Sequence, residues 1–176
     1  MGIVKEVAGW IFEIVVTVLI AFTCVYFAGL RTSVVGQSME GTLSSGDEIL
    51  VNRFLYKVTD PKPNDLVVFL PNGNEKSHYY VKRVIAVPGD TVLIKNGAVY
   101  VNGELFQEEA EVASIEEAGL AAEEITLGDD EYFVLGDNRN NSADSREPSV
   151  GTILRQNMIG RAVFRIWPLD GVGFLN

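Results

Sequence analysis

The sequence has almost none of the side chains that build disulfide bonds, metal sites or histidine-based active sites. Among its 176 residues are one cysteine, Cys24, and one histidine, His78. A single cysteine excludes both an intramolecular disulfide and a thiolate zinc site, so the fold must rest on core packing. A single histidine excludes a metal site that needs several of them. We therefore predict no metal in the functional site.

Basic side chains are scarce as well. The 14 Lys and Arg residues stand against 24 Asp and Glu residues, which gives a net charge of −10. The basic residues are not clustered, and so acidic a surface repels phosphate backbones. We therefore expect no nucleic-acid partner.

Charge is nearly absent from one long apolar run close to the N-terminus. Residues 14–30 read IVVTVLIAFTCVYFAGL, and extending the run back to Ala8 adds only one charge, at Glu13. As a helix, residues 8–30 would reach about 34 Å, against roughly 30 Å for the hydrocarbon core of a bilayer. The run is long for a buried core helix, and it lacks the A-x-A site of a removable signal peptide. We predict a transmembrane anchor over about residues 8–30, with the lipid bilayer as a partner.

The flanks of this run do not orient it. One basic side chain lies near each end, Lys5 before and Arg31 after, so the distribution of positive charge decides nothing. We divide the chain here into residues 1–31, which include the anchor, and residues 32–176, which have room for one domain with its own core.

Beyond Arg31 the sequence predicts a mainly β fold. Short apolar runs rich in β-branched and aromatic residues alternate with turn residues, and no later window has a long 3.6-residue period. The predicted strands are residues 48–54, 66–70, 79–87, 91–94, 98–101, 132–135 and 162–167. Asn96 and Gly97, between two of them, favour a type I′ hairpin.

One stretch of this region is strongly acidic. About eleven Asp and Glu residues and no Lys or Arg occur over about residues 103–131. A run of like charges is usually a solvated face of the protein, so we predict a surface excursion with one or two helical turns.

A Ser-His-Asp triad does not fit this sequence. The one histidine, His78, precedes a predicted strand and is interpreted as an ordinary exposed or half-buried residue, and no serine lies in a G-x-S-x-G turn. A neutral lysine can take a hydroxyl proton as an imidazole does. Its pKa, ordinarily near 10.4, would have to fall by about three units, which requires a dry pocket without a stabilising carboxylate.

Lys82 is the candidate for such a base. It lies in YYVKRVIAV, residues 79–87, the most continuously apolar predicted strand beyond the anchor. Side chains alternate along a strand, so if Arg83 takes the polar face, Lys82 points with Tyr80 and Val84 toward the buried face. On this pattern alone, a lysine that reaches from a sheet edge into solvent remains the alternative.

Two polar loops favour the catalytic interpretation. Residues 36–47, GQSMEGTLSSGD, form a small-residue loop shortly after the anchor, where glycine near Ser38 would let a substrate backbone come close. Residues 136–146, GDNRNNSADSR, follow an apolar strand and have hydrogen-bonding side chains at nearly every position. Such a density of polar groups indicates a fixed internal network instead of a flexible link.

With these segments in order, the chain resembles the bacterial type I signal peptidases, a family of membrane-anchored Ser/Lys proteases. SMEGTL (residues 38–43) resembles the family's S-M-x-P-T-L, and KRVIAVPGD (82–90) its K-R-x-x-x-x-P-G-D. Residues 136–146 resemble its G-D-N-R-x-N-S-x-D-S-R, and GDEILV (46–51) fits the intervening strand box. Together with the anchor, the resemblance covers the chain from end to end.

The resemblance implies a role for each matching residue. Ser38 would be the nucleophile and Lys82 the general base. Ser142 would hydrogen-bond the lysine amine and orient it, while Asp144 and Arg146 would pair as structural support beside the site. The resemblance also implies a β-rich catalytic domain outside the cell membrane and an N-terminus in the cytoplasm.

Two positions depart from the family pattern. Where the family has proline in the serine box this chain has Gly41, which would loosen the turn after the nucleophile. Some members have a hydroxyl residue two positions before the serine as a second oxyanion donor, and that position is Gly36 here. The resemblance places Gly36 and Met39 at the substrate cleft and makes the main-chain N–H of Ser38 one oxyanion donor. Another N–H or a bound water would be the second.

The implied function is the removal of N-terminal signal peptides from exported preproteins. Neutral Lys82 would take the proton of Ser38, and cleavage would follow small residues, as in A-x-A sites, through an acyl-enzyme and without a cofactor. Two alternatives remain open: another Ser/Lys protease, such as a self-cleaving repressor or a peptidase of a secretion or conjugation system, and an inactive anchored scaffold. A self-cleaving repressor should have a DNA-binding module where this chain has an anchor, and the presence of both catalytic candidates argues against a scaffold.

Overall fold

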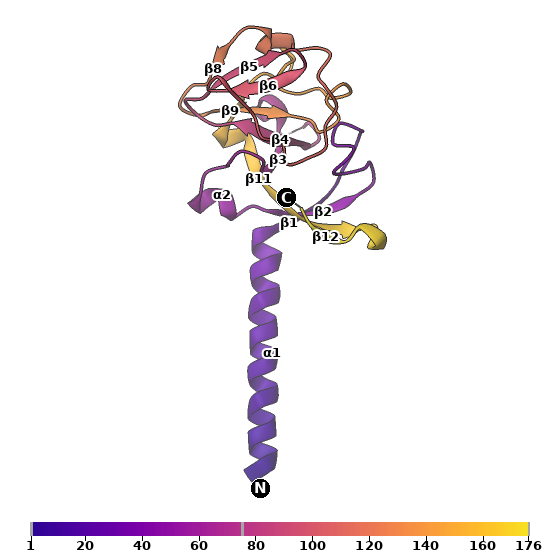
Figure 1. Ribbon diagram of the computed structural model, residues 1–176. Helices are drawn as coiled ribbons and strands as arrows, with labels where there is room; N and C mark the ends of the chain where they lie inside the picture. Colours follow the sequence, from indigo (N-terminus) through magenta and orange to yellow (C-terminus); the bar gives the residue numbers. More distant parts are fainter. Residues whose placement is uncertain (1, 75, 176) are drawn as a thin grey trace.

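A long N-terminal helix leads into a β domain in the computed structural model (Figure 1). The structure describes residues 2–74 and 76–175, without the side chains of residues 4 and 24–28, so the side chain of Cys24 lies outside it. Helix α1 spans Gly2–Ala28. Its segment Lys5–Thr23 is long and apolar enough to cross a membrane, and none of that segment is buried in the protein. The helix ends two residues before the predicted anchor does, because the first strand begins at Gly29.

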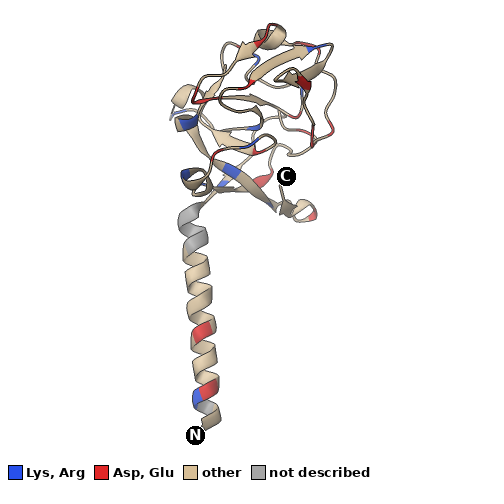
Figure 2. Ribbon diagram, turned by 60° about the vertical axis from the view of Figure 1, so that its left-hand side comes forward, with Lys and Arg blue, Asp and Glu red and all other residues tan. Residues whose placement is uncertain are grey.

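The charges of α1 are confined to its N-terminal half. Along the helix, Figure 2 shows blue and red residues only in the half far from the β domain, and the last charged residue of the helix is Glu13. The half of α1 that adjoins the β domain is therefore uncharged, which is compatible with a segment that crosses a membrane.

The β domain consists of two antiparallel sheets. The larger has the strand order β1-β2-β11-β3-β4-β9-β10, with β12 paired to β11. Its strands are β1 (Gly29–Ser33), β2 (Glu48–Asn52), β3 (Leu66–Phe69), β4 (Tyr80–Ala86), β9 (Glu131–Leu135), β10 (Ile153–Leu154), β11 (Met158–Trp167) and β12 (Gly173–Phe174). The smaller sheet has the order β7-β6-β5-β8, with strands β5 (Thr91–Lys95), β6 (Ala98–Val101), β7 (Glu104–Leu105) and β8 (Ile125–Thr126).

The helical segments beyond α1 are short. They are the α-helix α2 (Leu55–Val58) and the 3-10 helices η1 (Pro71–Gly73), η2 (Gly119–Ala122), η3 (Arg155–Asn157) and η4 (Leu169–Gly171).

The predicted mainly β fold is confirmed, and each predicted strand is present within a few residues of its expected bounds. The predicted hairpin is present as well. Asn96 and Gly97 join β5 to β6 with φ angles of 52° and 77°, and a type I′ turn requires positive φ at both positions. Strands β1, β7, β8, β10 and β12 were not predicted from the sequence.

The acidic segment is tied to the core of the β domain. Most of its carboxylates are exposed, but Ile115, Ala121 and Leu127 are buried in one hydrophobic cluster with Val92 of β5 and Phe133 of β9. These apolar side chains, spaced along the acidic segment, hold it against both sheets. The segment is thus folded as part of the domain.

Candidate active site

Ser38 lies in the loop that joins β1 to β2. The loop closes in a tight turn just after the serine, where the main-chain N–H groups of Thr42 and Leu43 donate to the carbonyl oxygen of Met39 at 3.0 and 2.7 Å. Gly41 has a φ of +103° within this turn. Proline is fixed near −65° and cannot adopt that angle, so glycine suits the turn formed here. These hydrogen bonds hold the turn, although Gly41 was expected to loosen it.

Lys82 lies in the middle of β4 and points at this serine. Its Nζ is 2.7 Å from Ser38 Oγ, and the residue is 3% exposed. The ring centroid of Tyr80, two residues earlier on the same face of the strand, is 5.3 Å from Nζ. The structure therefore brings the two predicted catalytic residues into hydrogen-bond contact in a largely dry position.

Burial makes this lysine easier to deprotonate. It lowers the pKa of Lys82 from 10.5 to about 8, while the carboxylates of Asp144, Asp137 and Glu147 act in the opposite direction. The drop is smaller than the three units expected, because the pocket has carboxylates near it. Roughly a tenth of the lysine is neutral at pH 7 with a pKa of about 8.

Arg83 corrects one expectation from the sequence. It does not take a solvent-facing side of β4: it is 1% exposed, because the strand is covered on both faces. Its Nε and Nη2 each donate to a carboxylate oxygen of Asp137 at 2.9 Å. The hydroxyl of Thr42 donates to the same carboxylate at 2.5 Å.

This buried group connects three separate segments of the chain. Thr42 belongs to the serine loop, Arg83 follows Lys82 in β4, and Asp137 belongs to the polar loop, residues 136–146. All three residues stand inside the matched motifs, but the sequence assigned none of them a role. Their burial is the missing information, since an alternating strand pattern does not reveal that both faces are covered.

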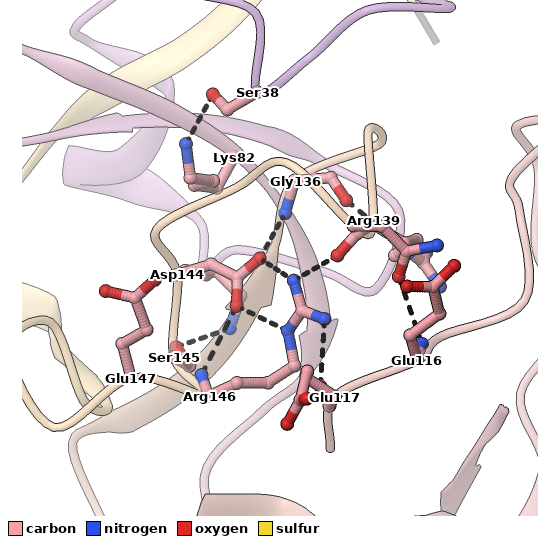
Figure 3. A network of polar contacts seen from close by, with 12 residues as sticks. Ser38, Lys82, Glu116, Glu117, Gly136, Arg139, Asp144, Ser145, Arg146 and Glu147 are labelled. Atoms are coloured by element: carbon pink, nitrogen blue, oxygen red, sulfur yellow. Dashed lines mark hydrogen bonds and ion pairs between the residues drawn. The ribbon is translucent and has the colours of Figure 1, made fainter. Parts of the chain in front are cut away.

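The polar loop forms the network that its composition predicted (Figure 3). Asp144 and Arg146 pair through two contacts of 2.8 Å, and Asp144 is fully buried. Asp144 also accepts a hydrogen bond from the main-chain N–H of Gly136 at 3.0 Å. Arg146 Nη2 in turn donates to the carbonyl oxygen of Arg139 at 2.6 Å. The expected ion pair is formed, and it closes the two ends of the loop on each other.

Ser142 does not make the hydrogen bond to Lys82 that the resemblance implied. Its Oγ is buried and has no hydrogen-bond partner among the described residues. It packs against Gly136: a Cβ placed on that glycine would lie 2.2 Å from Ser142 Oγ and 2.4 Å from the carbonyl oxygen of Ser38. The main-chain N–H of Asn138 donates to this same carbonyl at 3.1 Å. Ser142 therefore lies near Ser38, because both residues pack against Gly136.

The ion pair between Arg139 and Glu108 was not predicted from the sequence. The guanidinium of Arg139 forms two contacts, of 2.6 and 2.7 Å, with the carboxylate of Glu108 from the acidic segment. Arg139 Nε also donates to the carbonyl oxygen of Gly136 at 3.1 Å. Glu108 is separated from Arg139 by about thirty residues of sequence and stands in no motif, so the sequence contained no signal for this contact.

Ser38 and Lys82 border a groove of about 310 Å³ that we call the catalytic groove. Its lining residues are Val34, Val35, Gly36, Gln37, Ser38, Met39, His78, Tyr79, Tyr80, Val81, Lys82, Asn141 and Ala143. The predicted cleft residues Gly36 and Met39 both lie there; Met39 is 1% exposed, and the N–H of Gly36 donates to Ser45 Oγ at 3.3 Å. His78 is exposed at the groove.

Comparisons with known proteins agree with one another. The family model described as "Signal peptidase, peptidase S26" matches residues 7–167. "Probable signal peptidase I-2" of Synechocystis sp. is 37% identical over 157 residues, which are 84% of this chain and 70% of that protein. "Signal peptidase I P" of Bacillus subtilis subsp. natto is 36% identical over 175 residues, 96% of this chain and 93% of that protein.

A solved structure of a signal peptidase I from Enterococcus faecalis is also similar, with 25% identity and a TM-score of 0.45; the match covers 59% of this chain and 97% of that one. The family model covers most of this chain, and the two relatives exceed 30% identity over most of its length. The chain belongs to the signal peptidase family, peptidase S26, whose members are serine proteases.

Proposed function

We propose that this protein is a membrane-anchored endopeptidase that removes N-terminal signal peptides from exported preproteins, with Ser38 as nucleophile and Lys82 as general base. The observation that carries the proposal is the 2.7 Å contact between Lys82 Nζ and Ser38 Oγ inside the protein. A lysine at this distance can take the serine proton once it is neutral, and its lowered pKa provides a neutral fraction near physiological pH.

The reaction runs in two steps that use the same pair of atoms. Neutral Lys82 takes the proton of Ser38 Oγ while the oxygen attacks the substrate carbonyl carbon. The resulting ammonium gives its proton to the leaving amine, and the carbonyl carbon stays bound to Ser38 as an ester. The lysine, neutral again, then takes a proton from a water that attacks the ester. The ammonium returns this proton to Ser38 Oγ as the ester bond breaks, and the carboxylic acid product leaves and ionises in water. No cofactor takes part.

Main-chain groups of the serine loop stabilise the developing negative charge. The N–H of Ser38 makes no hydrogen bond within the described residues and is the first oxyanion donor. The main chain at Ser38 is held on its carbonyl side, because the carbonyl oxygen of Ser38 accepts a hydrogen bond from the main-chain N–H of Asn138. Such preorganised donors are worth several kcal/mol to acyl transfer in other enzymes, about 2.7–4 for one donor. Ser142, Asp144 and Arg146 support the loop that packs against this segment.

The catalytic groove favours small side chains next to the scissile bond. Its volume of about 310 Å³ is at the low end of the range for small-molecule sites, about 300–1,000 Å³, and it has to hold several residues of a peptide. We propose a preference for alanine or similarly small residues at the first and third positions before the cut. An oversized side chain there should cost on the order of 1–3 kcal/mol. Equal cleavage of peptides with Ala, Leu or Phe at those positions would contradict this preference.

We propose that residues 1–31 comprise a short cytoplasmic end and the single-pass anchor, and that residues 32–176 form the extracytoplasmic catalytic domain. The apolar helix and the family support this arrangement, although β1 begins inside the first segment. Protease added to cells stripped of their wall should then digest the protein beyond Arg31. Full protection until the membrane is permeabilised would contradict the topology.

The experiment that tests the proposal is cleavage of a preprotein by purified full-length protein in liposomes. Ser38→Ala should abolish the release of the signal peptide. Ser44→Ala is the matched control, because Ser44 is an exposed serine of the same loop that lies outside the catalytic groove. Undiminished cleavage by folded Ser38→Ala protein would exclude the assigned nucleophile.

A further inference from the structure

Asparagine is followed by glycine at three places in this protein: Asn72-Gly73, Asn96-Gly97 and Asn102-Gly103. Asparagine is a thermolabile residue, and a following glycine leaves the main-chain nitrogen beside it unhindered. All three asparagines are exposed, and their φ angles are 52°, 52° and 54°. The chain therefore contains one reactive dipeptide in three environments that can be compared with one another.

Such a dipeptide can rearrange in water without an enzyme. The glycine nitrogen attacks Cγ of the asparagine, and the side-chain nitrogen leaves as ammonia together with the proton of the glycine N–H. Water then opens the resulting succinimide ring at one of its two carbonyl groups. The product is aspartate or isoaspartate, in which the main chain runs through the side-chain carbons. The reaction therefore needs a mobile side chain and an accessible glycine nitrogen.

Asn96-Gly97 meets both requirements. The pair lies in the smaller sheet, between β5 and β6, at the end of the β domain far from α1 (Figure 1). Within the described part of the chain, neither the Asn96 side chain nor the peptide group between the two residues makes a hydrogen bond. This peptide group can rotate while Lys95 and Ala98 stay paired, which converts type I′ to type II′ and brings ψ of Asn96 to about −120°. At that angle the glycine nitrogen faces the side-chain carbon, as ring closure requires.

Asn102-Gly103 is the matched comparison within the same chain. It forms a second two-residue turn, between β6 and β7, and its φ angles of 54° and 78° nearly equal the 52° and 77° of Asn96-Gly97. Its side chain is held at both ends: Oδ1 accepts a hydrogen bond from the N–H of Thr91 at 2.9 Å, and Nδ2 donates to Asp90 Oδ1 at 2.7 Å. The two turns therefore share a backbone geometry and differ in the freedom of the asparagine side chain.

Asn72-Gly73 is held in another way. The side-chain amide of Asn72 donates to the carbonyl oxygen of Ser149 at 3.0 Å. The N–H of Gly73, which would have to attack, donates to the carbonyl oxygen of Leu70 at 3.1 Å. Both reacting groups are occupied, so this pair must open before the ring can form.

We propose that Asn96 is a site of spontaneous conversion to isoaspartate in the folded protein, and that this modification releases the acidic segment from the β5–β6 hairpin. The carbonyl of Gly97 accepts a hydrogen bond from the N–H of Ile115 at 3.0 Å, and a Cβ on Gly97 would overlap the hydroxyl of Ser114. Isoaspartate lengthens the main chain by one carbon, so Gly97 loses either its position in the hairpin or its close contact with this part of the acidic segment.

The test measures all three pairs in one sample of purified full-length protein in detergent micelles, incubated at mildly alkaline pH. Peptide mapping by mass spectrometry gives the loss of each asparagine, and methylation by an isoaspartyl methyltransferase identifies isoaspartate. We expect conversion at Asn96 to be at least about tenfold faster than at Asn72 and Asn102, because their hydrogen bonds must open first.

A parallel sample unfolded in urea provides the reference. There the same dipeptide has no fixed partners, so the three pairs should convert within about threefold of one another. Equal rates at Asn96 and Asn102 in the folded protein, or an Asn96 that converts only in urea, would overturn the assignment of Asn96.

Hydrogen exchange at the N–H of Ile115 tests the release of the acidic segment. This exchange should be faster in the isoaspartate form than in freshly purified protein. Asn96→Gly is the matched control, because glycine keeps a left-handed turn and has no side chain that could form the ring, so its exchange should not change during the incubation. Equal exchange in the modified and unmodified protein would show that the segment stays attached. None of these measurements depends on peptidase activity, so their outcome is independent of the proposed function.

Discussion

Two opposing effects set the pKa of Lys82. Burial lowers its pKa to about 8, and the carboxylates of Asp144, Asp137 and Glu147 prevent a larger drop. In the proposed mechanism only the neutral amine accepts the serine proton, so kcat/KM for a soluble peptide should rise with pH and level off above an apparent pKa of about 8. Rates measured from about pH 6 to pH 10 test this. A flat profile over that range would exclude Lys82 as the base.

The same burial costs stability, and the sign of its pH dependence follows from linkage. The folded protein releases the proton of Lys82 at about pH 8 and the unfolded chain at about 10.5. Between these values the unfolded state binds more protons, so the free energy of unfolding rises with pH. Below about pH 8 the cost is complete, roughly 3 kcal/mol at 1.36 kcal/mol per pKa unit.

Lys82→Met should therefore be inactive and yet no less stable than the unmodified protein at pH 7. Methionine is flexible and unbranched and can fill the pocket without a charge. The difference in the free energy of unfolding between Lys82→Met and the unmodified protein should be smaller near pH 9.5 than at pH 7, by about half or more. Urea titrations at the two pH values measure it.

Lys82→Arg should lose at least about a thousandfold in single-turnover rate, because a guanidinium cannot act as a base. Near-normal turnover by folded Lys82→Arg protein would end the Ser/Lys mechanism.

Gly136 packs against the main chain of Ser38, so the position of Ser38 relative to Lys82 depends on it. A Cβ there would lie 2.4 Å from the carbonyl oxygen of Ser38, a main-chain atom that cannot turn aside as a side chain can. We expect Gly136→Ala to displace the serine loop by a large part of an ångström and to cost about a hundredfold in kcat or more. Gly128→Ala is the control, because the nearest atom to a Cβ there is the flexible carboxylate end of Glu131 at 3.3 Å. Equal rates for the two variants would contradict the close packing.

At this scale the sequence predicted the candidate pair Ser38 and Lys82 and the supporting pair Asp144 and Arg146. It missed the buried partners Arg83, Asp137 and Arg139. Ser38 and Lys82 stand in recognisable boxes, and the alternation in β4 correctly placed Lys82 inside. The same alternation misplaced Arg83, because it assumes one wet face, whereas β4 is covered on both sides and Arg83 is neutralised by Asp137. Burial of that kind depends on which strands become neighbours. A local pattern does not contain that information.

The acidic segment braces the candidate active site through its contacts with the polar loop. Besides the pair of Glu108 with Arg139, the side chain of Asn140 accepts from the N–H of Glu116 and donates to the carbonyl of Ser114, at 3.0 Å each. The N–H of Leu120 donates to the carbonyl of Arg146 at 2.9 Å. The loop that packs on Ser38 is therefore braced from outside by a part of the chain with no catalytic motif.

Glu108→Ala should destabilise this brace. It leaves the guanidinium of Arg139, which is 2% exposed, without its carboxylate, and the expected loss is about 1–3 kcal/mol in the free energy of unfolding. Activity should fall as well, because Arg139 also holds the carbonyl of Gly136. Glu109→Ala, at the exposed neighbouring position, should change stability by less than about 0.5 kcal/mol. Thermal melts and peptide cleavage of both variants provide the measurement, and indistinguishable variants would show that the brace is not needed.

Elements were predictable in proportion to their length and their local pattern. The long apolar helix, the strands of four or more residues with β-branched side chains and the Asn-Gly hairpin were all found from sequence. Strands β7, β8, β10 and β12 have two residues each, which is too short for any periodicity to show. Strand β1 was hidden because Gly29 and Leu30 continue the apolar run of the helix, and only pairing with β2 makes them strand residues.

At the scale of the whole molecule, the proposed function places Ser38 within a limited reach of the apolar helix α1. Ser38 follows the last residue of α1 by ten residues, so it stands at most about 33–36 Å from the end of the helix even if the chain were fully extended. In the proposed function, a preprotein held in the same bilayer by its signal peptide would be confined to that zone as well. Confinement of both partners raises their effective concentration without any added contact.

Removal of α1 should therefore separate catalysis from confinement. The apolar segment Lys5–Thr23 of the helix is not buried against the rest of the protein, so a chain that begins at Gly29 should keep both sheets and the contact between Ser38 and Lys82. We expect its kcat/KM for a short soluble peptide to stay within about twofold of the full chain. On a preprotein in liposomes it should fall by roughly 10²–10⁴, the range that tethering commonly contributes. An unrelated transmembrane helix of the same length in place of α1 should restore the rate on the preprotein, since the account needs only a tether. Equal losses on both substrates would instead mean that α1 stabilises the catalytic domain itself.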